Sequence, residues 1–148
     1  MRLPSHARDL RRAARGFTFI EIVVAIAIIA ILATVVVPRV IGRVGEARVA
    51  RAKSDVQALR TALDTYKLDN FNYPSTDQGL QALINKPGGQ PEAANWKQTL
   101  DALPKDPWGR DYQYLSPGQH GEIDVYSLGK DGQPAGEGED ADIGNWTG

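Results

Sequence analysis

The chain has 148 residues, enough for one compact domain with appendages and too few for a large multidomain machine. Its formal charge is −1, but five of its 17 bases lie in the first 16 positions beside one acid, which leaves 12 bases and 17 acids elsewhere. That body lacks the basic face that nucleic-acid binding needs, so we expect no nucleic-acid partner. The absence of cysteine excludes disulfides, thiolate metal sites and cysteine nucleophiles.

An apolar run from 17 to 37 contains a single charged residue, Glu21. As a helix rising about 1.5 Å per residue, this run would be roughly 31 Å long, close to the thickness of the hydrocarbon core of a bilayer. Soluble helices rarely stay apolar on every face over such a length, so the pattern predicts a single transmembrane helix. The arginines before it predict a cytoplasmic N-terminus and a body on the other side of the membrane.

Gly16 is the small residue at the boundary between the basic head and the apolar run. A secretory signal has its cleavage site after the apolar run, whereas a cut after Gly16 would remove the charges and keep the anchor. The boundary sequence 16–21, GFTFIE, resembles the processing motif of the type IV pilin and pseudopilin superfamily. The resemblance implies that 1–16 is a leader, that a prepilin peptidase cuts after Gly16, and that Phe17 becomes the N-methylated terminus.

Glu21 lies four residues beyond Phe17, inside the apolar run. A charge within a bilayer costs about 2.5 to 3.5 kcal/mol on insertion scales, so an ionised Glu21 needs a partner. Lipid headgroups would serve if Glu21 lay at the membrane interface. The resemblance instead implies that Glu21 pairs with the methylated amine of a neighbouring subunit and so directs the assembly of a filament.

Pro38 follows the apolar run and predicts a kink or a locally melted turn. We expect one continuous helix, the alternative being that Pro38 ends the anchor and a second helix begins. Gly42 and Gly45 each weaken a helix by about 1 kcal/mol relative to alanine, so 34–45 should be its most deformable part. Over 38–68, apolar residues recur at alternating spacings of four and three, which predicts an amphipathic helix packed on a domain. They are Ala52, Val56, Leu59, Leu63 and Tyr66.

The remaining chain, 69–148, is expected to form a globular body. Capping residues and an apolar cluster predict a short helix over 78–84. Alternating apolar and polar residues over 111–115 and 123–128, separated by turn formers at 116–121, predict an antiparallel hairpin. With a third strand, the predicted fold class is α+β, a long N-terminal helix packed on a small antiparallel sheet.

Four segments of the body, 73–80, 106–109, 112–114 and 142–146, resemble the major pseudopilins of type II secretion systems. This resemblance implies a non-enzymatic subunit of the bacterial inner membrane that polymerises into a short periplasmic filament and drives export of folded proteins across the outer membrane. Its implied partners are further copies of the chain, the prepilin peptidase, minor pseudopilins and an inner-membrane secretion platform. A type IV pilin for adhesion, motility or DNA uptake remains an alternative, as does a membrane-anchored binding module.

The segment 129–145 holds five acids, one lysine and five glycines. Several carboxylates and carbonyls on a glycine-rich backbone suit Ca²⁺, although the spacing is not that of an EF-hand. From the residues alone, a solvated acidic tail explains the segment equally well. The resemblance to type II major pseudopilins implies a calcium site with Asp131 as the firmest side-chain ligand and either Asp140 or Asp142 as the second. It also implies carbonyl ligands from Leu128 and Gln133.

No other pattern indicates chemistry. The two histidines, His6 and His120, support neither a histidine metal cluster nor a Ser-His-Asp arrangement, and His120 is expected to be a simple turn residue. The tryptophans at 96, 108 and 146 are expected to anchor the core and the loops. We therefore assign no catalytic residue.

Overall fold

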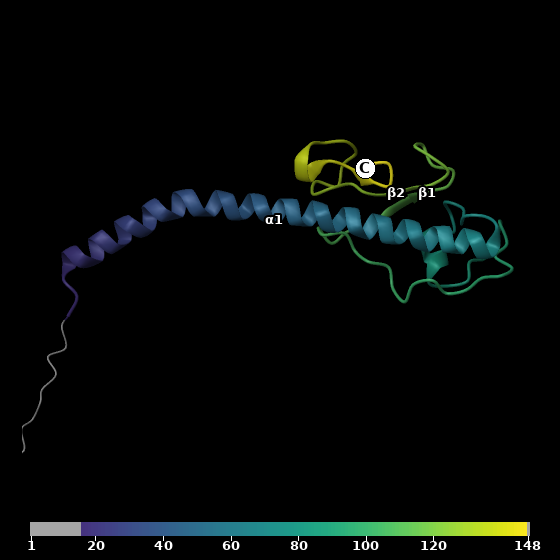
Figure 1. Cartoon of the computed structure of the whole chain (residues 1–148), viewed down its shortest axis with the longest axis horizontal. Helices are drawn as coiled ribbons and strands as arrows, with labels where there is room; N and C mark the ends of the chain where they lie inside the picture. The colour runs from purple at the N-terminus through teal and green to yellow at the C-terminus, as the bar shows by residue number, and fades with distance from the viewer. Residues whose placement is uncertain (1–15, 148) are drawn as a thin grey trace, which may run out of the picture. The chain divides into compact units, whose positions relative to one another are not determined.

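The computed structural model describes residues 16–147, and over 35–41 it describes the helical backbone but not the side chains. Of the predicted leader, 1–15 lies outside the described residues. The chain separates into two compact units, with the boundary between Val40 and Ile41. The elements, in chain order, are helix α1 (Phe19–Asn70), 3₁₀ helix η1 (Leu80–Leu83), strands β1 (Gln113–Leu115) and β2 (Asp124–Ser127), 3₁₀ helix η2 (Gly138–Asp140) and strand β3 (Ile143–Gly144) (Figure 1).

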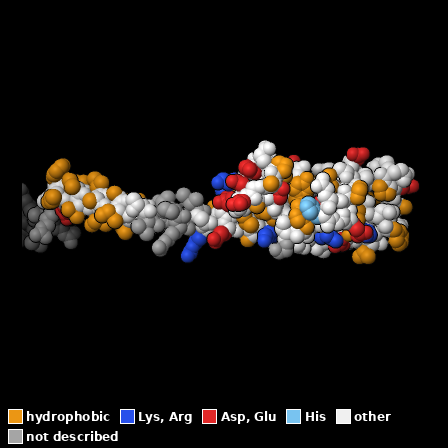
Figure 2. All heavy atoms as spheres, turned by 90° about the horizontal axis from the view of Figure 1, so that it is seen from above, with side chains coloured by type: hydrophobic (Ala, Val, Ile, Leu, Met, Phe, Trp, Pro, Cys, Tyr) orange, Lys and Arg blue, Asp and Glu red, His pale blue; other side chains and the backbone are white. Residues whose placement is uncertain are grey.

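Helix α1 stays helical through Pro38, so the alternative of two separate helices is wrong. It ends at Asn70, two residues beyond the predicted end. In the N-terminal unit its large apolar side chains from Phe19 to Leu32 are exposed, as Figure 2 shows in orange. The described helices nevertheless include none that combines the length and hydrophobicity needed to cross a membrane. The transmembrane helix expected over 17–37, which extends into residues without described side chains, is therefore not confirmed.

In the C-terminal unit, α1 buries one face, as its periodicity predicts. All five predicted residues are buried, none more than 2% exposed: Ala52, Val56, Leu59, Leu63 and Tyr66. Four of them, from Val56 onward, join a core to which η1 contributes Leu80 and Leu83, and the hairpin contributes Ile123 and Val125. Burying each large aliphatic side chain stabilises the fold by about 1.5 to 3 kcal/mol, so this face holds the body on α1.

The sheet has the order β1-β2-β3 and is antiparallel throughout. Tyr114 lies opposite Val125, which confirms the predicted hairpin, and Tyr126 lies opposite Gly144 in the short third strand. Gly144 is buried, and a Cβ there would collide with the ring of Trp146. The short helix expected over 78–84 is the 3₁₀ turn η1. Gly79, just before it, has φ +61°, a conformation that an α-helix does not allow.

Three tyrosine hydroxyls tie segments of the body together. Tyr112 donates to Asp55 of α1 at 2.9 Å, and Tyr73 donates to Asp64 of α1 at 2.6 Å. Tyr114 donates to the carbonyl of Pro74 at 2.8 Å. Burial, followed by the hydrogen bond to Asp55, raises the pKa of Tyr112 well above its ordinary value, so the phenol stays a donor at neutral pH.

Phe71 ends α1 in a left-handed conformation, with φ +67°, and its N–H donates to the Lys67 carbonyl at 2.7 Å. Glycine or asparagine usually occupies this position, because a Cβ is strained there. The Phe71 side chain is 79% exposed, so little packing offsets the strain.

Replacing Phe71 with glycine should therefore stabilise the protein, by about 0.5 to 1 kcal/mol once the larger entropy of the unfolded glycine is subtracted. Urea unfolding of the full chain in detergent, followed by tryptophan fluorescence, measures the change. Leu68→Ala is the control, because Leu68 is equally exposed but helical, and it should have almost no effect. A Phe71→Gly protein less stable than the wild type would contradict the strain argument.

Candidate functional site

The N-terminal motif lies where α1 begins. Gly16 and Phe17 precede the helix, are exposed and have no regular secondary structure, so the peptide bond between them is accessible. Thr18 and Glu21 form a capping box: the Glu21 N–H donates to Thr18 Oγ1 at 3.3 Å, and the Thr18 N–H donates to Glu21 Oε2 at 3.4 Å. The motif thus starts the helix immediately after the predicted cleavage position.

The sequence analysis missed this capping role of Glu21, although the spacing Thr18-x-x-Glu21 signals it. The carboxylate remains exposed at the helix start and, within the described residues, forms no salt bridge with a basic side chain. Its second oxygen therefore remains available to a cation such as an amine. A cap holds Glu21 near Phe17, the position that cleavage would turn into a new N-terminus.

The acidic loop, 129–145, begins at a buried polar network. Asp106 is 4% exposed and accepts hydrogen bonds from Ser127 Oγ at 2.7 Å and from the N–H of Arg110 at 2.8 Å. Ser127 Oγ in turn accepts from the Gly129 N–H at 3.2 Å, and the Arg110 guanidinium donates to the Gly129 carbonyl. This network explains the 106–109 motif physically, because it fixes the first residue of the acidic loop.

The beginning of the acidic loop, 129–130, lies beside residues 139–140 of the same loop. The Lys130 N–H donates to the Glu139 carbonyl at 2.8 Å. Gly129, with φ +65°, approaches the backbone of Asp140 so closely that a Cβ would collide with it. Glycine is therefore required at this crossing. Acidic side chains gather at the N-terminal end of the C-terminal unit (Figure 2).

The aspartates predicted as calcium ligands differ in their exposure and in their hydrogen bonds. Asp131 is exposed, and its Oδ1 accepts from the N–H of Gln133 at 3.0 Å. Asp142 is half-buried: Oδ2 accepts from the Ala135 N–H at 3.0 Å, whereas Oδ1 is buried without a hydrogen-bond partner among the described residues. Asp140 is half-buried too. Across 16–147, no three His, Cys, Asp or Glu side chains converge as a metal cluster, so a cation here would also need backbone carbonyls.

His120 does more than the simple turn residue we expected. Its ring stacks on Trp146 with centroids 3.9 Å apart and 12° between planes, and its Nδ1 lies 2.9 Å from Oδ2 of the buried Asp124. These contacts hold the chain just beyond the acidic loop. No local pattern marks the pair, because the two rings are 26 residues apart in the sequence.

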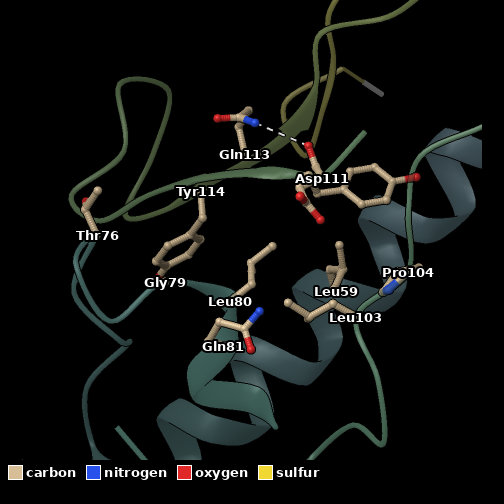
Figure 3. Close-up of a pocket in the computed structure, with 11 residues that line it drawn as sticks. Leu59, Thr76, Gly79, Leu80, Gln81, Leu103, Pro104, Asp111, Gln113 and Tyr114 are labelled. Atoms are coloured by element: carbon tan, nitrogen blue, oxygen red, sulfur yellow. Dashed lines mark hydrogen bonds between the residues drawn. The ribbon is translucent and has the colours of Figure 1, made fainter. Parts of the chain in front are cut away.

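A pocket beside the sheet combines Leu59 of α1, Leu80 of η1 and Tyr114 of β1 (Figure 3). The one carboxylate in its lining, Asp111, lies 2.6 Å from the Lys105 ammonium group. The described lining contains no nucleophile held by a base and no pair of carboxylates, which are the arrangements that hydrolytic chemistry uses. This pocket therefore supports no catalytic assignment.

A long N-terminal helix that begins at a processing motif and packs on a small antiparallel sheet defines a pilin-like filament subunit. A model of the prokaryotic N-terminal methylation motif matches residues 11–37. A model of type II secretion system protein G matches residues 39–146. The chain therefore belongs to the type II secretion system protein G family.

Comparisons with individual proteins support the same family assignment. The chain is 56% identical over 138 residues to the type II secretion system core protein G of Pseudomonas aeruginosa, covering 92% of this chain and 97% of that protein. It is 54% identical to the protein of the same name from Vibrio cholerae, covering 89% and 91%. The crystal structure of the major pseudopilin of enterohaemorrhagic Escherichia coli matches with a TM-score of 0.66 at 50% identity, covering 76% of this chain and 98% of that one.

The buried network at Asp106 yields a stability prediction. Asp106→Ala should destabilise the body by about 3 kcal/mol, because three donors, among them the Trp108 N–H, lose a charged acceptor in a buried site. Urea unfolding of the full chain measures the loss. Asp101→Ala, at an exposed aspartate nearby in the sequence, should change stability by less than about 0.5 kcal/mol. Equal effects of the two substitutions would show that the network contributes little.

Proposed function

We propose that this chain is the major structural subunit of a type II secretion pseudopilus, the filament that drives export of folded proteins across the outer membrane. The observation that carries the proposal is the processing motif directly before α1, on a chain whose remaining length matches protein G. In this function a prepilin peptidase cuts after Gly16 and Phe17 is N-methylated. The match to protein G over 39–146 favours this function over a type IV pilin or a membrane-anchored binding module.

The proposed topology is a single pass through the bacterial inner membrane, with the N-terminus in the cytoplasm and the body in the periplasm. The exposed apolar side chains from Phe17 to Leu32 and the arginines before them support it. In the filament these apolar helices would pack against one another, which offsets their removal from lipid. The proposed partners are other copies of this chain, the prepilin peptidase, minor pseudopilins and the inner-membrane secretion platform.

The proposed task is mechanical rather than enzymatic. The chemistry that it needs from this chain is an accessible bond after Gly16, a free amine at Phe17 and a carboxylate at Glu21. The capping box supports this arrangement, because it keeps the carboxylate at the helix start, beside the residue that becomes the terminus. An amine on a neighbouring copy would then compensate the charge of Glu21 in an apolar filament core.

Co-expression with a prepilin peptidase should yield a chain whose first residue is methylated Phe17, as read by mass spectrometry of the N-terminus. Glu21→Ala should be cut normally but give about tenfold less filament or lower, because one partner of a buried charge pair is lost. Filament yield after shearing measures the second effect. Thr18→Ala is the matched control, since it removes the hydrogen bond to Thr18 Oγ1 but keeps the Glu21 carboxylate and its hydrogen bond from the Thr18 N–H, and its yield should stay near wild type. An uncut wild-type chain, or normal filaments from Glu21→Ala, would refute the assignment.

We also propose that the acidic loop binds Ca²⁺ through the carboxylates of Asp131 and Asp142 and the carbonyls of Leu128 and Gln133. Two observations support the fit: the donors are hard oxygens on a glycine-rich backbone, and Asp142 has a buried oxygen without a partner in the described chain. The same oxygen favours Asp142 over Asp140 as the second side-chain ligand. When bound, the ion would compensate the acids and order the loop, which has no disulfide to hold it.

Excess chelator should lower the melting temperature of the full chain, and added Ca²⁺ should restore it. At a free concentration about 100 times its dissociation constant, the ion would stabilise the fold by about 2.7 kcal/mol. Asp142→Asn should abolish this calcium dependence, whereas Asp140→Asn should retain it. Thermal melts at matched ionic strength, with Mg²⁺ as a further control, separate specific binding from screening. Identical melts in calcium and in chelator would disprove the site.

A further inference from the structure

Gly45 is a buried glycine in the C-terminal part of α1, and its neighbours Val44 and Glu46 are exposed. The side chain of Glu139, from η2 in the acidic loop, covers it. A Cβ on Gly45 would collide with the carboxylate end of the Glu139 side chain, so an alanine here would push that side chain out of this position. Gly42, one turn earlier, has open space around it.

The contact joins two parts of the chain that are far apart in sequence and lie side by side in the fold. Figure 1 shows η2, in yellow, next to α1. The hollow around Gly45 is lined from α1 by Gly42, Glu46, Val49, Ala50 and Lys53, and from the loop by Glu139 and its neighbour Gly138, so it holds two carboxylates and one ammonium group. Aliphatic carbons can therefore pack against the stem of Glu139, while Lys53 supplies a positive charge in the same hollow.

Glu139 connects the acidic loop to α1, because its backbone and its side chain contact different segments. Its carbonyl accepts the hydrogen bond from the Lys130 N–H, which joins the middle of the acidic loop to its beginning. Its side chain reaches α1 near the start of the C-terminal unit, where Gly42 and Gly45 make the helix intrinsically weak. Glu139 thus contacts the beginning of the acidic loop through its backbone and the glycine-containing turn of α1 through its side chain.

We propose that Glu139 and Gly45 form a latch, in which Glu139 is a positioning residue that seats the acidic loop in the notch at Gly45. The latch couples the order of the loop to the order of α1 over 42–50. Because coupling is reciprocal, a ligand that orders the loop also stabilises this helix segment. The latch itself is independent of the proposed calcium site; only its response to calcium rests on that proposal.

Hydrogen exchange of the full chain in detergent, read by mass spectrometry on peptides from 42–50 and 129–142, tests the latch. In chelator, Gly45→Ala should speed exchange in the loop about tenfold, because the Cβ displaces Glu139. Gly42→Ala is the matched control: it makes the same gain in helix propensity and should slow exchange in the helix about fivefold. Because the coupling is reciprocal, it should never speed exchange in the loop, in contrast to Gly45→Ala. Unchanged loop exchange in Gly45→Ala would overturn the proposal.

A double-mutant cycle separates the latch from general damage. Once Glu139→Ala has removed the side chain, adding Gly45→Ala should cause no further increase in loop exchange, because the two residues act as one contact. Additive effects would overturn the proposal.

Calcium provides the last arm of the experiment. In the wild type, calcium should slow exchange in both the loop and 42–50, and in Glu139→Ala it should slow only the loop. Slowing of the loop alone in the wild type would overturn the coupling. If calcium changes neither segment, the calcium site fails, while the comparison of Gly45→Ala with Gly42→Ala in chelator still decides the latch.

Discussion

The packing of one face of α1 against the body is the interaction on which the rest of the described C-terminal unit depends. From Val56 to Tyr66, that face forms one side of the hydrophobic core, and the hairpin and η1 form the other side. The three strands have only three, four and two residues, shorter than typical strands, so the sheet depends on the helix that covers it. The helix therefore does more than carry the body: it completes its core.

This dependence suits the mechanical role proposed for the chain. In the proposed filament, the N-terminal part of α1 packs among its copies, and any load on it reaches the body through a continuous helix. Apolar burial resists separation at every residue of the face, and the hydroxyls of Tyr112 and Tyr73 add directional bonds to Asp55 and Asp64. Within the described residues, α1 runs without a break from Phe19 to Asn70, so its helical backbone connects its N-terminal part to the body.

The acidic loop is held by polar contacts in place of apolar ones. Asp106 and Arg110 fix its beginning, Glu139 seats its middle on α1, and the stacked rings of His120 and Trp146 hold the chain beyond it. Five acids within 17 residues would otherwise repel one another and leave the loop extended. Apart from the stacked rings, these contacts either satisfy a carboxylate or use the close approach that a glycine allows, which is how a loop with little apolar surface keeps a defined course.

Local patterns in the sequence were enough to predict α1, its buried face and the hairpin, because helical periodicity and strand alternation are properties of neighbouring residues. They were also enough to find the processing motif, where residue types follow one another directly. Local patterns did not predict the long-range contacts. These are the contact of Glu139 with Gly45, the stacking of His120 on Trp146, and the burial of the Asp142 oxygen that has no partner in the described chain, which distinguishes Asp142 from Asp140. These contacts depend on which distant segments come together once the core has formed. A local sequence pattern carries no information about such tertiary contacts, because the residues involved are not neighbours in the sequence.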